Sequence, residues 1–126
     1  MKRQWVVINE QHSLLPEQGA LLDAEYFVVK VPASGWTYEE QLEVAQDLAL
    51  EATSCHIWGD EPNATIVFVS PVPALLKLLG HVSGRLQGEG KRSFDVLCFH
   101  NDQREKKELP DGRIISVTAK TGWQLV

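Results

Sequence analysis

The chain has 126 residues, the size of one domain whose hydrophobic core needs no disulfide or metal to support it. Hydrophobic residues make up 44% and charged residues 23%, a composition typical of globular proteins and too apolar for a disordered chain. With 12 basic and 17 acidic residues the net charge is −5, which disfavours a general binder of long DNA or RNA. We therefore expect a single folded domain over residues 1–126.

The longest apolar stretch, residues 65–79, is interrupted by a serine, two prolines and a lysine. It falls well short of the roughly 20 apolar residues that cross a bilayer. The basic start of the chain precedes an apolar run too short for a signal peptide, and Cys55 and Cys98 have no metal-ligand spacing, so both are expected as reduced, packed thiols. The sequence thus predicts a soluble, cytoplasmic protein without a membrane partner.

Two strands and a short helix are expected first. Residues 5–8 are all apolar, the pattern of a strand buried on both faces. A helix is expected around Pro16, with four leucines as its buried stripe, ending near Asp23. Residues 26–31 are rich in β-formers and stop at a Pro-Ala-Ser-Gly turn, which predicts the second strand.

A capping box, Thr37 with Glu40, predicts the start of the second helix. Its apolar residues recur at steps of three and four, and its acidic residues face away from them, which indicates a solvated outer face. Residues 59–63 break the chain, and residues 65–69 form the most apolar strand-like segment. That segment is expected at the centre of the sheet.

Ser70 is predicted to cap the third helix, with Pro71 at its first position and an end at residues 88–90. Gly80 and Gly84 leave a flat strip on this helix. Such a strip usually packs closely on a sheet or on another helix, including one in a second subunit.

Residues 94–99 and 113–117 predict the last two strands, joined as a hairpin through the turn at residues 109–112, with the final strand antiparallel at an edge. Strands and helices therefore alternate along most of the chain. This order predicts an α/β fold, a Rossmann-like three-layer sandwich with a mainly parallel sheet of about five strands.

Ligands of such sheets bind beyond the carboxyl ends of the strands. The loops expected there are polar and contain His12, His100 and Trp36. They also place hydroxyl groups beside helix starts, where free amides suit a phosphate: Ser13, Ser34, Thr37 and Ser70. The alternatives stay open: the hydroxyls serve as caps alone, the histidines lie on the surface, and Trp36 is a packing anchor.

Familiar chemical motifs are missing. The sequence has no glycine-rich dinucleotide loop, no triphosphate-binding loop, no paired zinc ligands and no nucleophile elbow. Neither a cofactor nor a metal site is therefore predicted.

Two segments resemble a small CRISPR-associated family of type III systems, Rossmann-like relatives of CARF domains that include ring nucleases. Residues 12–18 are similar to the N-x-S-H-x-L-T-x-E-Q opening of these proteins, and residues 67–71 match their strand running into a proline-marked turn before a leucine-rich helix. The order of elements agrees along nearly the whole chain. This chain departs from the pattern at His12-Ser13, where the family has serine before histidine.

The resemblance implies binding of cyclic oligoadenylate, most often cyclic tetra-adenylate, across the two-fold axis of a homodimer, with higher assembly open. The protein would then down-regulate type III CRISPR signalling, either as a ring nuclease or as a sponge that sequesters the messenger. Cleavage in such relatives needs no metal, because the ligand's own ribose 2′-hydroxyl attacks the adjacent phosphorus. The implied catalytic residues are His12 and Ser13, and the implied ligand-binding residues are Asn9, Ser34, Trp36, Ser70, Pro71, Arg104 and Lys106.

Two other classes of function remain open. A non-catalytic interaction subunit would use the Gly80 and Gly84 helix or the edge strand to join a partner. A nucleotide or nucleoside enzyme on the same fold is the third possibility, because a fold alone does not fix function.

Overall fold

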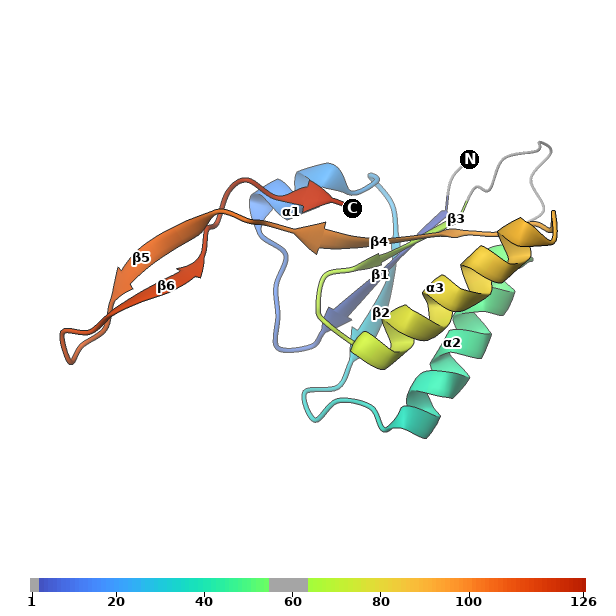
Figure 1. The fold of residues 1–126 in the computed structure, drawn as a ribbon, viewed down its shortest axis with the longest axis horizontal. Helices are drawn as coiled ribbons and strands as arrows, with labels where there is room; N and C mark the ends of the chain where they lie inside the picture. Colours follow the sequence, from blue (N-terminus) through green and yellow to red (C-terminus); the bar gives the residue numbers. More distant parts are fainter. Residues whose placement is uncertain (1–2, 55–63) are drawn as a thin grey trace.

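The computed structural model describes residues 3–54 and 64–126 (Figure 1). The predicted features at Cys55 and at residues 59–63 lie outside the described residues. Three helices are present in the described ranges: α1 Pro16–Leu21, α2 Tyr38–Thr53 and α3 Pro73–Gly88. Seven strands are present there: β1 Arg3–Asn9, β2 Phe27–Val31, β3 Ala64–Phe68, β4 Asp95–His100, β5 Arg104–Glu108, β6 Ile114–Thr118 and β7 Gln124–Leu125.

The main sheet has the order β2-β1-β3-β4-β7. The first four strands are parallel, and β7 is antiparallel to β4. The chain crosses from β1 to β2 in one direction and from β2 through β3 to β4 in the other, so right-handed connections place α1 on one face and α2 with α3 on the other (Figure 1). The predicted mainly parallel α/β fold is confirmed, and β3 is its central strand.

The core has two unequal halves because successive side chains of a strand point to opposite faces. Trp5 and Val7 join the larger half beneath α2 and α3. Val6 and Val67 join a smaller half on the other face, where Leu22 packs against them. Strand β1 is therefore buried on both faces, as its sequence predicts.

The start of α2 follows the predicted capping box. The Glu40 N–H donates to Thr37 Oγ1 at 3.1 Å, and the Thr37 N–H donates to Glu40 Oε1 at 3.1 Å. This exchange satisfies two backbone donors that the first helical turn leaves unpaired. For Thr37 the capping interpretation is confirmed.

The start of α3 corrects a prediction. Ser70 does not cap this helix, which begins at Pro73 with Val72 at the N-cap position. A residue that precedes proline is disfavoured in the helical region, and Val72 has φ −131° and ψ 80°. Ser70 and Pro71 therefore belong to the connection between β3 and α3, which leaves the Ser70 hydroxyl available for other partners.

The predicted hairpin between residues 94–99 and 113–117 is also wrong. Strand β4 pairs with β3 and β7, and β6 pairs with β5. The sequence predicts no strand at Arg104–Glu108 because all five residues are charged, a composition that disfavours strands. These charges are tolerated because the β5–β6 ribbon is separate from the main sheet and leaves β5 exposed throughout.

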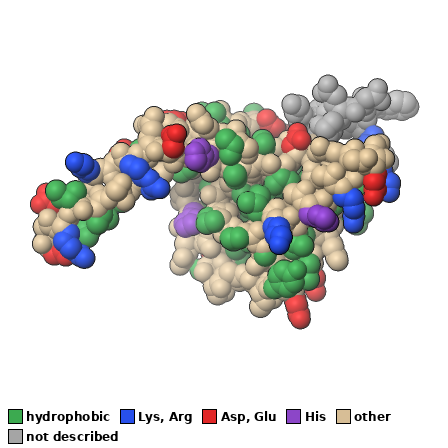
Figure 2. Space-filling view, in the orientation of Figure 1, with side chains coloured by type: hydrophobic (Ala, Val, Ile, Leu, Met, Phe, Trp, Pro, Cys, Tyr) green, Lys and Arg blue, Asp and Glu red, His purple; other side chains and the backbone are tan. Residues whose placement is uncertain are grey.

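The β5–β6 ribbon, residues 104–118, projects from the body as an arm (Figures 1 and 2). Its base is held by Asn101, whose Nδ2 donates to the carbonyl oxygens of Ala119 at 2.9 Å and Thr121 at 2.8 Å. Just beyond the arm, Glu17 Oε1 accepts hydrogen bonds from the Gly122 and Trp123 N–H groups at 2.7 and 2.8 Å. The segment that carries β7 is thereby tied to α1.

Two further findings concern the helices. A Cβ built at Gly80 or Gly84 meets nothing within 4 Å, so the predicted close packing of this strip is not found within the described chain. No helix in residues 3–54 or 64–126 is both long and apolar enough to cross a bilayer.

Candidate functional site

The connections leaving β1 and β3 run in opposite directions, and these two strands are neighbours in the sheet. Such a switch point opens a crevice outside the carboxyl ends of the two strands, where open α/β sheets bind their ligands. Asn9 is the last residue of β1, and Ser70 follows β3 by two residues. The sheet therefore brings two predicted site residues, 61 positions apart in the chain, to the same place.

Ser70 is the centre of a small cluster that we call the Ser70 cluster, made of Asn9, His12 and Ser70. The Asn9 N–H donates to Ser70 Oγ at 2.8 Å, and His12 Nδ1 lies 2.7 Å from the same oxygen. Ser70 is only 3% exposed, whereas the His12 side chain belongs to an exposed residue. A buried hydroxyl thus joins the ends of two strands and holds one nitrogen of an accessible imidazole.

The hydrogen bonds of Ser70 indicate which ring nitrogen of neutral His12 carries the proton. Ser70 Oγ already accepts from the Asn9 N–H, and its own O–H needs an acceptor because buried polar groups are costly when unpaired. His12 Nδ1 is the acceptor at hydrogen-bond distance. With Nδ1 as the acceptor, neutral His12 carries its proton on Nε2, which makes this N–H of an exposed residue a donor for a ligand.

The Asn9 side chain shapes the loop rather than facing a ligand. Its Oδ1 accepts from the Gln11 N–H at 2.9 Å, and its Nδ2 donates to the Pro32 carbonyl at 3.4 Å. Next to it, Glu10 Oε1 accepts from the Ala33 N–H at 2.8 Å. Because both ends of the Asn9 amide are engaged, its contribution to the crevice is the position that it gives His12.

The remaining predicted residues of the first three loops divide into two groups. Ser13, Ser34 and Pro71 are exposed, and neither hydroxyl makes a hydrogen bond with the described part of the chain. Trp36 is half-buried and packs against the larger half of the core, which favours the packing-anchor interpretation. Its side chain is therefore engaged in packing rather than free to stack on a base.

Gln41 ties these loops together and is not among the predicted residues. Its Nε2 donates to the Trp36 carbonyl at 3.1 Å, and its Oε1 accepts from the Leu75 N–H at 2.9 Å. It thereby joins the start of α2 to the first turn of α3. The sequence does not predict this role, because the Leu75 N–H that Gln41 binds lies 34 residues away in the chain.

Arg104 and Lys106 are not part of the Ser70 cluster. Both belong to β5, and Arg104 Nη1 donates to Thr118 Oγ1 at 3.0 Å on the neighbouring strand of the arm. His100 ends β4 and is exposed, paired in register with Gln124. Positive charge is therefore carried by the arm, which leaves the body beside the carboxyl edge of the sheet (Figure 1).

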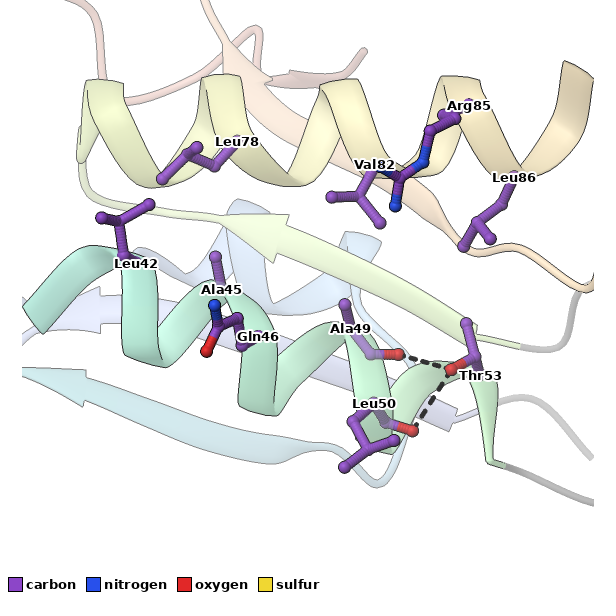
Figure 3. A pocket seen from close by; sticks show the side chains of 10 residues that line it. All are labelled: Leu42, Ala45, Gln46, Ala49, Leu50, Thr53, Leu78, Val82, Arg85 and Leu86. Atoms are coloured by element: carbon purple, nitrogen blue, oxygen red, sulfur yellow. Dashed lines mark hydrogen bonds between the residues drawn. The ribbon is translucent and has the colours of Figure 1, made fainter. Parts of the chain in front are cut away.

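A hollow of about 430 Å³ lies between α2 and α3 (Figure 3). Its lining is mostly aliphatic, and Thr53 uses its hydroxyl to donate to the Ala49 carbonyl at 2.7 Å. No set of polar groups converges on it from the ten residues that line it: Leu42, Ala45, Gln46, Ala49, Leu50, Thr53, Leu78, Val82, Arg85 and Leu86. The Ser70 cluster, and not this hollow, is the candidate chemical site.

Charged groups elsewhere do not form a second site. The pKa of Glu89 is lowered by a hydrogen bond and the positive charge of Lys91, whose Nζ lies 2.9 Å from Glu89 Oε2. This exposed pair lies beyond the carboxyl end of α3. Within residues 3–54 and 64–126, no three His, Cys, Asp or Glu side chains gather as metal ligands do.

No family model matches the chain, and neither the curated proteins nor the solved structures include a match. Support for a function therefore comes from the geometry of the Ser70 cluster and from the sequence motifs around it.

Proposed function

We propose that the chain binds a small phosphate-bearing nucleotide in the crevice at the carboxyl ends of β1 and β3. Cyclic oligoadenylate, most simply cyclic tetra-adenylate, is the ligand that the sequence resemblance suggests. Binding would lower the concentration of this messenger and so down-regulate type III CRISPR signalling. A homodimer would present two such crevices to one symmetric ring.

The observation that carries this proposal is the hydrogen bond between Ser70 Oγ and His12 Nδ1 at 2.7 Å. It directs a neutral N–H donor into the crevice at the switch point, where a phosphate oxygen is a suitable acceptor. The exposed hydroxyls of Ser13 and Ser34 lie on the loops that follow β1 and β2. They would add neutral donors to phosphate or ribose oxygens.

Cleavage and sequestration differ in what they require of the protein. Sequestration needs only affinity and abundance. Cleavage also needs the ligand's ribose 2′-oxygen held in line with the phosphorus and the leaving 5′-oxygen, with developing charge stabilised by donors such as His12 Nε2–H. Since the chemistry is the ligand's own, a site without a strong general base is compatible with either outcome.

The test is incubation of the purified protein with labelled cyclic tetra-adenylate in EDTA, followed by a native gel for binding and a denaturing gel for cleavage. A retarded band with a linear product identifies a ring nuclease, and a retarded band without product identifies a sponge. His12→Ala should weaken binding by about tenfold, the loss of roughly 1.4 kcal/mol of hydrogen bonding. His81→Ala is the matched control, because His81 is also exposed but lies on α3.

No retardation with any ring size would overturn the proposal. It would leave the second candidate function, a non-catalytic interaction subunit. The specific observation in favour of that candidate is the arm, a two-stranded ribbon that stands away from the body (Figure 2). An isolated ribbon of this kind is only marginally stable in water, so contact with a partner would stabilise it.

A further inference from the structure

One edge of the main sheet is open. Strand β2 is the end strand of the order β2-β1-β3-β4-β7, so its outer backbone groups have no strand beside them in the described chain. Phe27 is 55% exposed and Val28 is 54% exposed, and they point to opposite faces of the sheet. An exposed, apolar edge strand is a template for pairing with another chain.

A shallow cavity of about 380 Å³ runs along this edge beneath α2. Its floor is apolar, with the Phe27 ring stacked on Trp5 at a centroid distance of 5.6 Å. Its rim is acidic, because Asp47 and Glu51 line it from α2. Helix α2 carries five acidic residues and no basic one: Glu39, Glu40, Glu43, Asp47 and Glu51.

This acidic rim disfavours a β2–β2 contact between two copies. A two-fold axis through paired β2 strands would bring the two acidic α2 helices to the same face of the joined sheet. Like charges held opposite each other destabilise an interface. The edge is better suited to a partner that places an apolar strand beside β2 and basic side chains on the far side of that strand, within reach of the acidic α2.

The arm has this pattern. Strand β6, Ile114–Thr118, has an open outer edge, and Ile114 is 67% exposed. Strand β5 lies behind it and carries three basic residues, Arg104, Lys106 and Lys107. Arg104, Lys106 and Glu108 share one face of the ribbon with Ile114, since residues two apart on a strand point the same way and Ile114 is in register with Glu108. This face therefore carries two cations and one carboxylate.

We propose that the arm of a second copy docks on this edge, with its β6 pairing with β2, and that the exchange is reciprocal. Ile114 and Ile115 then pack beside Phe27 and Val28, one on each face of the extended sheet. The face of the arm that carries Lys106 lies toward α2. Lys106 is in register with Ser116, whose small side chain leaves room for the lysine to extend across β6 to Asp47. Reciprocal exchange covers both open edges and both arms with one closed two-fold contact.

The spacing of the charges agrees with this arrangement. Asp47 and Glu51 are four residues apart on a helix, which separates them by about 6 Å along its axis. Arg104 and Lys106 are two residues apart on a strand, which separates them by about 6.7 Å. The interval between the two cations therefore nearly equals that between the two carboxylates, of which Glu51 also accepts a hydrogen bond from Trp5 Nε1 at 3.1 Å.

The test uses the whole chain without ligand and measures the dissociation constant of the dimer by sedimentation over a concentration series. Lys106→Glu and Asp47→Lys should each weaken the dimer by at least about tenfold, because each places like charges together. The double variant, with the two charges exchanged, should recover most of the loss. Far-ultraviolet circular dichroism of each variant checks that it is folded.

Lys107→Glu is the matched control. It makes the same charge change on the adjacent residue, which points to the opposite face of the arm. It should leave the dissociation constant within about twofold of the wild type. Any one of four results would overturn the proposal. The wild type could be a monomer at every concentration, or its dimer could be insensitive to both charge reversals. The double variant could fail to recover the affinity, or Lys107→Glu could cause an equal loss. The measurement needs no nucleotide, so it is independent of the function proposed above.

Discussion

Removing the Ser70 hydroxyl is the most informative single change. Ser70→Ala deletes the acceptor of the Asn9 N–H and the partner of His12 Nδ1, at 2.8 and 2.7 Å respectively. His12 is exposed, so water replaces the lost partner there at little cost. The half-buried Asn9 N–H has no such replacement, which costs about 1–2 kcal/mol.

Urea denaturation measures this loss directly, and thermal denaturation should show a fall of about 3–8 °C for a domain of this size. Ser13→Ala is the control, because Ser13 is exposed and its hydroxyl makes no hydrogen bond with described residues. It should change the free energy of unfolding by less than about 0.5 kcal/mol. Equal stability of the two variants would refute the structural role assigned to Ser70.

Nitrogen NMR of the His12 ring tests whether Ser70 donates its hydroxyl proton to His12 Nδ1. In the wild type at a pH where His12 is neutral, the ring should show a protonated Nε2 and an unprotonated Nδ1. A protonated Nδ1 would mean that Ser70 accepts from His12 rather than donating to it. The N–H donor would then point at Ser70 and not into the crevice.

Three further predictions test the fold that supports the site. Thr37→Ala should lower the free energy of unfolding by about 1 kcal/mol by removing the α2 cap, and Thr37→Ser should restore most of it in the same urea titration. Gly122→Ala should destabilise by about 1 kcal/mol, because its φ of +90° is strained for a residue with a Cβ. Gly80→Ala should stabilise by about 0.5–1 kcal/mol, because a Cβ there meets nothing within 4 Å and alanine favours the helix. The opposite order of their melting temperatures would contradict this. Glu17→Ala should destabilise by about 1–3 kcal/mol and speed amide exchange at Gly122 and Trp123, and unchanged exchange there would show that the carboxylate does not anchor β7.

Much of the fold is predictable because local patterns decide it. Apolar runs indicate β1 and β3, and the Thr37 and Glu40 spacing gives the start of α2. The central place of β3 follows from its apolar sequence, whereas the full strand order is known only from the structure. These signals lie within short stretches of sequence, so tertiary context does not overturn them.

The errors have three separate physical causes. A serine followed by proline is typical of a helix start, yet the second proline at Pro73 restrains Val72 and moves the start of α3. Residues 113–117 were predicted to pair with residues 94–99, because the all-charged segment Arg104–Glu108 has no strand signal. A two-residue strand such as β7 has no periodicity to detect.

The candidate site was predicted in part. The loops after the strands place His12 and Ser70 at the carboxyl edge, and the family resemblance adds Asn9. The structure brings these three residues together. What the sequence does not show is which atoms meet: the Asn9 amide is engaged in its own loop, and Arg104 is carried away on the arm. Those contacts join segments that lie far apart in the sequence, so no local sequence pattern predicts them.

The most direct test of the central claim is an amide NMR titration of the whole protein with cyclic tetra-adenylate in EDTA. We predict that the largest shift changes fall on residues 9–13 and 69–72. We also predict that His12→Ala moves the midpoint of the titration to about tenfold higher ligand concentration, while His81→Ala leaves it unchanged. Changes confined to the hollow between α2 and α3, or no changes at saturating ligand, would contradict a nucleotide site at the carboxyl ends of β1 and β3.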